Sequence, residues 1–171
     1  MKYLIDCDGV IRKFVESIGM TEQHKSWIKL PDYVWDLLDN EPKKYLYDCN
    51  AYEDMIEHVK FLIASGFDVS FLTNQVGVPQ REYWTKKFIQ KHFGEDVNVI
   101  FTTTFQEKID LLLKYDDAIL IDDFPEFYRR KGFNKVKNRI YLMPRIWNES
   151  VRHHYPNIFK ITDEIWKHLE E

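Results

Sequence analysis

Residues 3–10 are YLIDCDGV: three apolar residues, then Asp6 and Asp8 on either side of a cysteine, then Gly9 and a valine. An apolar run of this length that ends in polar residues is typical of a strand buried on both faces, as in a parallel sheet. The run also breaks too soon for a signal peptide, whose apolar region spans roughly 7–15 residues. Residues 3–5 therefore predict a buried strand with Asp6 and Asp8 directly after it.

The same pattern recurs along the chain. Apolar runs at 69–72, 97–101, 118–121 and 139–143 each end in Thr or Asp, or, for the last run, in Pro. Helical patterns lie between them, beginning near residues 52, 79 and 106, and a last one begins at Thr162 or Asp163. For the first of these helices, Asn50 and Glu53 have the spacing of a capping box. This alternation predicts an α/β protein with a Rossmann-like, doubly wound parallel sheet.

One connection is far longer than an ordinary loop. Residues 12–51 separate the first strand from the first helix and are rich in aromatic side chains, among them Phe14, Trp27 and Trp35. We interpret this stretch as a small helical cap inserted after the first strand, with 1–11 and 52–171 forming the core. A cap that leaves the core just after the first strand would cover the end of that strand.

Polar side chains gather at one edge of the predicted sheet. Ligands bind outside the carboxyl ends of parallel strands, and those ends carry Asp6, Asp8, Thr73, Asp122 and Asp123. Four carboxylates in one crevice would repel each other strongly without a cation. Oxygen ligands of this kind suit Mg²⁺, which keeps waters and shares its remaining positions with a phosphate. The sequence therefore predicts a Mg²⁺ site and leaves a carboxylate available to attack phosphorus, an established role for Asp.

Four short motifs, in order along residues 3–148, resemble those of the haloacid dehalogenase superfamily. Residues 6–10, DCDGV, resemble its first motif, Asp-x-Asp-Gly-Val/Thr, and residues 71–74, FLTN, resemble its second. Lys108 is the best match to its lone lysine, and residues 121–123, IDD, resemble its acidic pair. The resemblance implies a Mg²⁺-dependent phosphohydrolase on the fold expected above.

The resemblance also implies a role for each matching residue. Asp6 would attack the phosphorus, while Asp8 would protonate the leaving oxygen and later activate water. The phosphoryl oxygens would be bound by Thr73, Asn74 and Lys108. The implied Mg²⁺ ligands are Asp6, the main-chain carbonyl of Asp8, and Asp122 or Asp123.

Within the superfamily, the chain most resembles the 5′(3′)-deoxyribonucleotidases, which also carry a short helical cap between the first two motifs. The resemblance therefore implies that a (deoxy)nucleoside monophosphate is the substrate. Phe14 lies six residues past Asp8 at the entry to the aromatic-rich cap, and it is the first candidate to stack on the base. Thr73-Asn74-Gln75 is closer to polynucleotide 3′-phosphatases and sugar-phosphate phosphatases, so both remain alternatives.

Two non-enzyme interpretations remain. A receiver-type phosphoacceptor also combines an acidic pair, Thr, Lys and Asp, but in another order along the chain, and an inactive relative would only bind phosphate. Cys7 does not indicate a cysteine phosphatase, because position 13 is Lys13 where a phosphate-binding Arg would stand. We interpret the basic run at 129–139 and the pair His153-His154 as solvated surface.

Length, net charge and cysteine content limit the kinds of partner and cellular location to expect. The 171 residues suit one domain, and the net charge of −4 gives no bulk attraction to nucleic acid or anionic lipid. Two cysteines make no disulfide framework, and no apolar run is long enough to span a membrane. We expect a cytoplasmic protein that acts on a small phosphorylated molecule. Nucleic acid is not the favoured partner, and the sequence does not indicate an oligomeric state.

Overall fold

The computed structural model describes residues 1–20, 32–75 and 79–161. All strands of its one six-stranded sheet are parallel, in the order β3-β2-β1-β4-β5-β6. The strands are β1 (Lys2–Ile5), β2 (Asp68–Asn74), β3 (Asn98–Thr102), β4 (Ala118–Asp122), β5 (Ile140–Leu142) and β6 (Asn157–Ile158). This order is that of a doubly wound sheet, so the predicted fold class is confirmed. The short edge strand β6 was not predicted.

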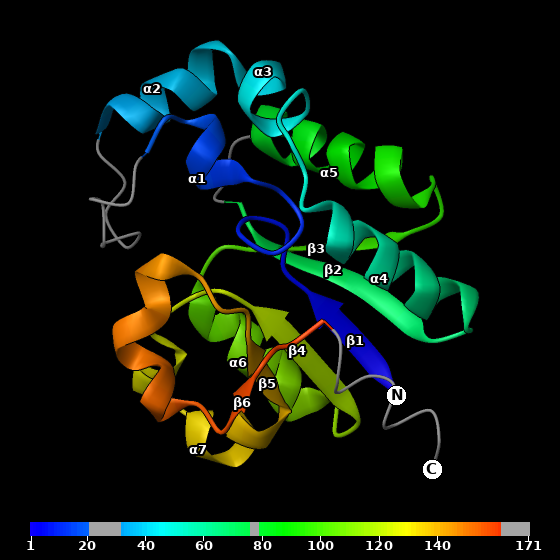
Figure 1. Cartoon of the computed structure of the whole chain (residues 1–171), viewed down its shortest axis with the longest axis vertical. Coiled ribbons are helices and arrows are strands. Elements are labelled where there is room, and N and C mark those ends of the chain that lie inside the picture. Colours follow the sequence, from blue (N-terminus) through cyan, green and yellow to red (C-terminus); the bar gives the residue numbers. More distant parts are fainter. Residues whose placement is uncertain (21–31, 76–78, 162–171) are drawn as a thin grey trace.

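The helices of the core cover both faces of the sheet (Figure 1). Those with regular α geometry are α4 (Glu53–Ala64), α5 (Pro79–Phe93), α6 (Phe105–Lys114) and α7 (Phe133–Val136). Three 3₁₀ segments follow β4 and β5: η1 (Phe127–Arg129), η2 (Lys137–Arg139) and η3 (Ile146–His154). The helix expected from Thr162 or Asp163 lies outside the described residues.

Strand alternation divides the core into two apolar layers. Tyr3, Ile5 and Phe71 point to the face that α4 and α5 cover, whereas Leu4 and Leu72 point to the face that α6 and α7 cover. Every one of these side chains is almost fully buried. Burial on both faces explains why the strands appear in the sequence as continuous apolar runs.

Two helix starts show how local sequence sets the boundaries. The hydroxyl of Thr104 accepts a hydrogen bond from the Glu107 main-chain nitrogen, which caps α6. The expected capping box before α4 is wrong, because the N-cap residue is Tyr52 and makes no side-chain cap. The main-chain carbonyl of Asn50 instead accepts a hydrogen bond from the main-chain N–H of Lys13 at 2.9 Å, so Asn50 belongs to the connection between cap and core.

Residues 12–51 contain α1 (Phe14–Ser17), α2 (Asp32–Asn40) and α3 (Pro42–Leu46). They share an apolar cluster of their own, which includes Phe14, Val34 and Leu46 and is separate from the two sheet layers. The chain leaves and re-enters the core at one place, since Tyr52 donates its main-chain N–H to the Ile11 carbonyl at 2.8 Å. Figure 1 shows these helices gathered at one end of the molecule beside α5. We refer to residues 12–51 as the cap; Trp27 lies outside the described residues.

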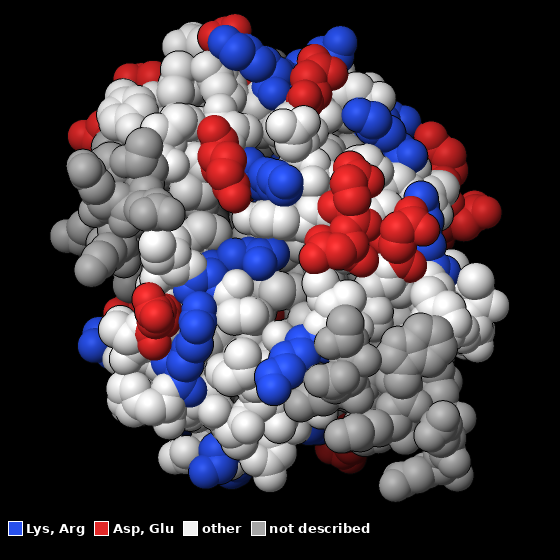
Figure 2. Space-filling model, viewed as in Figure 1, with Lys and Arg blue, Asp and Glu red and all other residues white. Residues whose placement is uncertain are grey.

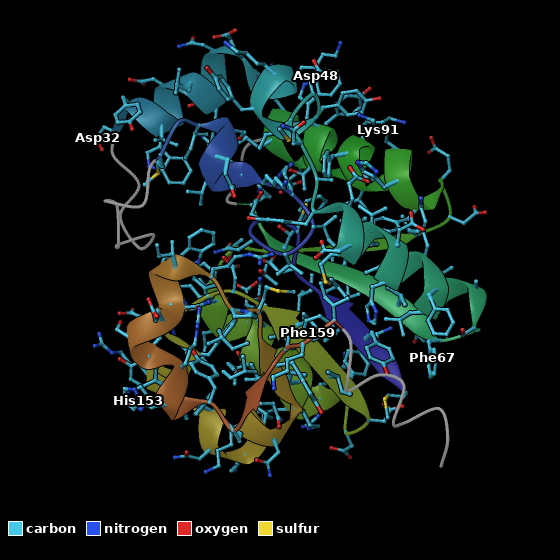
Figure 3. All side chains as sticks on the ribbon, in the orientation of Figure 1. Asp32, Asp48, Phe67, Lys91, His153 and Phe159 are labelled. Carbon is cyan, nitrogen blue, oxygen red and sulfur yellow. The ribbon has the colours of Figure 1, made fainter. Side chains whose placement is uncertain are left out.

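Within the described ranges, no helix is both long and apolar enough to cross a membrane. His153 and His154 are exposed, as expected, and His153 lies at the outer edge of the molecule (Figure 3).

His58 gives the fold a pH dependence. This α4 side chain is 8 % exposed, packs edge-on against Phe159, and its Nε2 has no hydrogen-bond partner among the described residues. Burial lowers the pKa of His58 below its usual value of about 6.5. The unfolded chain therefore takes up the proton first, and we expect the contribution of His58 to stability to fall as the pH drops below about 6.5, by at most about 1.4 kcal/mol per pH unit.

Urea unfolding at pH 7.5 and 5.5 measures this loss. His58→Leu should flatten the pH dependence, whereas the exposed control His153→Gln should not. Equal pH dependence in both variants would contradict the assignment to His58.

Candidate active site

Three buried carboxylates meet at the carboxyl edge of the sheet. Asp6 directly follows β1, Asp122 ends β4 and Asp123 comes next, with exposures of 6 %, 0 % and 3 %. The pairing of Ile5 with Ile121 sets Asp6 beside Asp122, where the strand order reverses between β1 and β4. One ligand oxygen from each carboxylate lies within 4.8 Å of the others. The sheet register thus assembles a compact acidic group, at the position where doubly wound folds bind ligands.

Lys108 on α6 reaches this group from the side. Its Nζ lies 2.7 Å from Asp122 Oδ2 and 2.8 Å from Asp6 Oδ1, and the side chain is fully buried. Burial lowers the pKa of Lys108, but the charges of Asp122 and Asp6 outweigh it and leave the pKa raised. Lys108 therefore stays a cation, and one positive charge faces three carboxylates.

The surroundings of Asp6 disfavour its charged form. Burial raises the pKa of Asp6 well above its usual range; Lys108 opposes this shift, and Asp122, Asp123 and Asp8 add to it. The Lys108 ammonium is paired with Asp6 Oδ1, and no other hydrogen bond reaches this oxygen among the described residues. A buried carboxylate oxygen in this state is suited to a cation or a reacting phosphoryl group.

The acidic pair at 122–123 is fixed by neighbouring groups. Asp122 Oδ1 accepts from the Phe124 main-chain nitrogen at 2.9 Å, and Asp123 Oδ2 accepts from Trp147 Nε1 at 2.8 Å. The Asn148 amide donates to the Asp123 carbonyl at 3.0 Å. Trp147 and Asn148 in η3 therefore orient Asp123, a role that sequence reasoning did not assign to them.

Thr73 and Asn74 end β2 on the same edge but face different surroundings. Thr73 is 1 % exposed, and its Oγ1 has no hydrogen-bond partner within the described part of the chain. A buried hydroxyl with no hydrogen-bond partner in the described part of the chain is suited to bind a ligand. The amide of Asn74 faces the end of β3, where its nitrogen can donate to the carbonyls of Thr102 at 2.7 Å and Thr103 at 3.2 Å. These contacts favour Thr73 over Asn74 as a phosphate ligand.

The Asp8 side chain stands apart from the acidic group. Its Oδ1 accepts from Arg12 Nε at 2.6 Å and its Oδ2 from Gln75 Nε2 at 2.9 Å. Three carboxylates thus converge where four were expected, because these two donors hold the fourth. A metal contact from Asp8 could come only through its main-chain carbonyl, and that contact stays a prediction.

Phe14 does not present a free ring to the site. It is 4 % exposed and packs within the cap cluster, so its burial argues against stacking on a base. Sequence reasoning also missed three polar residues beside the site: Arg12, Gln75 and Arg145. Arg145 Nε donates to the Gly9 carbonyl at 2.6 Å, and its guanidinium lies 3.9 Å from the ring centre of Tyr52. Only Arg12 left a signal, as a cation that directly follows the apolar pair at 10–11.

Comparison with known proteins bears on the fold. No protein-family model matches the chain, and no curated protein matches its sequence. A solved structure from Burkholderia xenovorans LB400, described as a haloacid dehalogenase-like hydrolase, superposes with a TM-score of 0.56. The alignment covers 99 % of this chain and 96 % of that one, at 12 % sequence identity. The chain therefore has the fold of a haloacid dehalogenase-like hydrolase over almost its whole length.

Proposed function

We propose that the protein is a Mg²⁺-dependent phosphomonoester hydrolase in which Asp6 is the nucleophile. The observation that carries this proposal is the meeting of Asp6, Lys108 and the acidic pair at the strand-order reversal, on the same sheet edge as the unpaired Thr73 hydroxyl. Phosphoryl transfer needs mainly positioning and neutralisation of charge, and these residues supply both.

The acidic group fits a divalent cation. Asp6, Asp122 and Asp123 offer hard oxygen ligands close together, and the residual negative charge after Lys108 favours a cation. When bound there, Mg²⁺ would neutralise the carboxylates and the phosphoryl oxygens. Haloacid dehalogenase-type phosphatases, which the motifs resemble, use Mg²⁺ in this way.

In the proposed reaction, an Asp6 oxygen attacks the phosphorus, the bond from phosphorus to the leaving oxygen breaks, and an aspartyl phosphate forms. Asp8 gives its proton to the leaving oxygen. Asp8 then takes a proton from a water molecule, which attacks the phosphorus and releases phosphate and free Asp6. Thr73 and Lys108 hold the phosphoryl oxygens in both steps.

A receiver-type role fits the structure less well. Receiver sheets have the order 2-1-3-4-5, whereas here β1 lies between β2 and β4. The acidic pair also follows β4 and not β1. The sheet order therefore favours an enzyme over a phosphoacceptor domain.

We propose a (deoxy)nucleoside monophosphate as the substrate class. The net charge is −4, and on the face shown in Figure 2 Lys and Arg side chains are interspersed with Asp and Glu. The resemblance of the motifs to those of the 5′(3′)-deoxyribonucleotidases supports this substrate class. The cap is short, so it leaves room for a small molecule more readily than for a protein. Because Phe14 is buried, we expect another cap aromatic to contact the base.

Phosphate release over three substrate classes tests both levels of the proposal. With Mg²⁺, we expect kcat/KM for deoxynucleoside monophosphates to exceed that for ribose 5-phosphate and for 3′-phosphorylated oligonucleotides, and EDTA should abolish all turnover. Mg²⁺ at 100 times its Kd should stabilise the fold by about 2.7 kcal/mol. Asp123→Asn should weaken that stabilisation, and the exposed Asp116→Asn should not.

The outcomes separate the two levels. Equal efficiency on nucleotides and ribose 5-phosphate would refute base recognition and leave the reaction standing. Failure to release phosphate from any substrate, together with a melting temperature that ignores Mg²⁺, would refute the enzyme and the metal site.

A further inference from the structure

We propose that Arg12 is a positioning residue that fixes the Asp8 carboxylate for proton transfer and makes its orientation depend on how the cap is seated. This inference rests on the proposed function, because it assigns Asp8 the proton-transfer role. It begins from an unusual placement: the Arg12 side chain is fully buried, although it follows the catalytic motif by only a few residues and stands where the chain enters the cap.

Arg12 uses its whole guanidinium to join three parts of the fold. Nε donates to Asp8 Oδ1 at 2.6 Å, and Nη1 donates to the Leu46 carbonyl at the end of α3 at 2.7 Å. Nη1 and Nη2 both lie 3.2 Å from the hydroxyl of Thr85 on α5. The catalytic loop, the cap and a core helix thus meet on one side chain.

Aromatic rings enclose this cation. The guanidinium carbon lies 5.3 Å from the ring centre of Phe88 and 5.9 Å from that of Phe14. Exclusion of water strengthens each charge-assisted hydrogen bond and makes an unpaired partner costly. Phe14, buried in the cap cluster, therefore helps to shield the Arg12 guanidinium from water.

Both carboxylate oxygens of Asp8 therefore accept a hydrogen bond. Gln75, which follows β2, donates to Oδ2, while Arg12, at the entry to the cap, donates to Oδ1. With both oxygens bonded, the carboxylate has one orientation. A shift of α3 would move the Leu46 carbonyl and with it the guanidinium that aims Asp8. The orientation of Asp8 that permits proton transfer therefore depends on the cap being packed against the core. A cap in that position also excludes water from the site.

The planar fork of arginine is necessary for this arrangement. Lysine carries the same charge, but a single ammonium cannot reproduce a fork that bonds Asp8 through Nε while Nη1 and Nη2 bond Leu46 and Thr85. Arg12→Lys should therefore keep the buried positive charge but no longer fix the orientation of the Asp8 carboxylate.

The test compares leaving groups. A p-nitrophenolate leaves without a proton, whereas the alkoxide of a deoxynucleotide or glycerol phosphate needs one from Asp8. Since kcat/KM reports the steps up to first phosphoryl transfer, we expect Arg12→Lys to lower it about 100-fold on the alkyl ester and less than about 10-fold on p-nitrophenyl phosphate.

Arg81→Lys is the matched control. Arg81 on α5 is also buried and also ties the core to the cap, through Asp39 on α2, but no hydrogen bond or ion pair joins it to Asp8 among the described contacts. Its replacement should change kcat/KM on both substrates by the same factor.

Thr85→Val gives a milder variant. It leaves the Arg12–Asp8 hydrogen bond in place and removes the Thr85 hydroxyl that Arg12 also contacts, so it should show the same leaving-group selectivity with a smaller loss of kcat/KM.

Each result is decisive. Selective loss on the alkyl ester in Arg12→Lys, absent in Arg81→Lys, supports the inference; equal loss on both esters overturns it. If Arg12→Lys does not fold, Thr85→Val decides by the same comparison. A wild type that hydrolyses neither ester refutes the proposed function and takes this inference with it, whereas an active wild type with unselective variants refutes the inference alone.

Discussion

Asp6→Asn is expected to lower kcat at least about 10⁴-fold, because Asp6 is the proposed nucleophile and its loss would remove the covalent step itself. The fold should survive, since the amide has nearly the shape of the carboxylate and removes one negative charge from a crowded acidic group. The pKa of Asp6 is raised, which means that its charged form is disfavoured in the folded protein. The melting temperature in EDTA should therefore stay level or rise.

The matched control for this variant is Asp116→Asn, an exposed aspartate that precedes β4 at the opposite edge of the sheet. It should leave both kcat and stability unchanged. Substantial Mg²⁺-dependent activity in Asp6→Asn, measured as phosphate release, would remove Asp6 from the nucleophile's role.

Gly9→Ala is expected to cost about 2–4 kcal/mol of stability, from backbone strain plus overpacking. Gly9 has φ of +76°, and a Cβ there would lie 2.1 Å from Asp123 Oδ2. The first loop can approach the acidic pair this closely only because glycine has no side chain. In a chain of this size, a loss of about 3 kcal/mol lowers the melting temperature by about 6–12 °C.

Gly66→Ala separates the two causes. Gly66 also has a positive φ, of +81°, but a Cβ there would meet nothing within 4 Å. It should carry only the strain of about 1–2 kcal/mol. Gly9→Ala should also weaken the response of the melting temperature to Mg²⁺, because the displaced carboxylate belongs to the acidic group. Equal losses in the two variants would contradict the close approach of Gly9 to Asp123.

The sequence determined the fold class because its signals are local. A buried strand must be apolar on both faces, so the runs at 3–5 and 118–121 mark central strands without knowledge of their neighbours. Parallel strands end at a common edge, which placed Asp6, Thr73 and Asp122 together before any distance was known. The residues at strand ends were therefore predictable as a set.

The sequence failed where one side chain had to choose among partners. Asp8 lies two residues from Asp6 in the first motif, yet Arg12, four residues further along, and Gln75, which follows β2, hold its carboxylate away from the acidic group. Phe14 was the sequence-based candidate to stack on a base, but the packing of α1 against the rest of the cap buries it.

Periodicity and composition thus determined which residues lie at the carboxyl edge of the sheet, because they reflect burial, and burial leaves a mark on every strand. Only the tertiary structure decided that the Thr73 hydroxyl lacks a hydrogen-bond partner among the described residues, which side chains orient the carboxylates, and how Arg12 links Asp8 to the cap. Those features depend on contacts such as that of Arg12 with Thr85, 73 residues apart, which have no local pattern that a sequence could display.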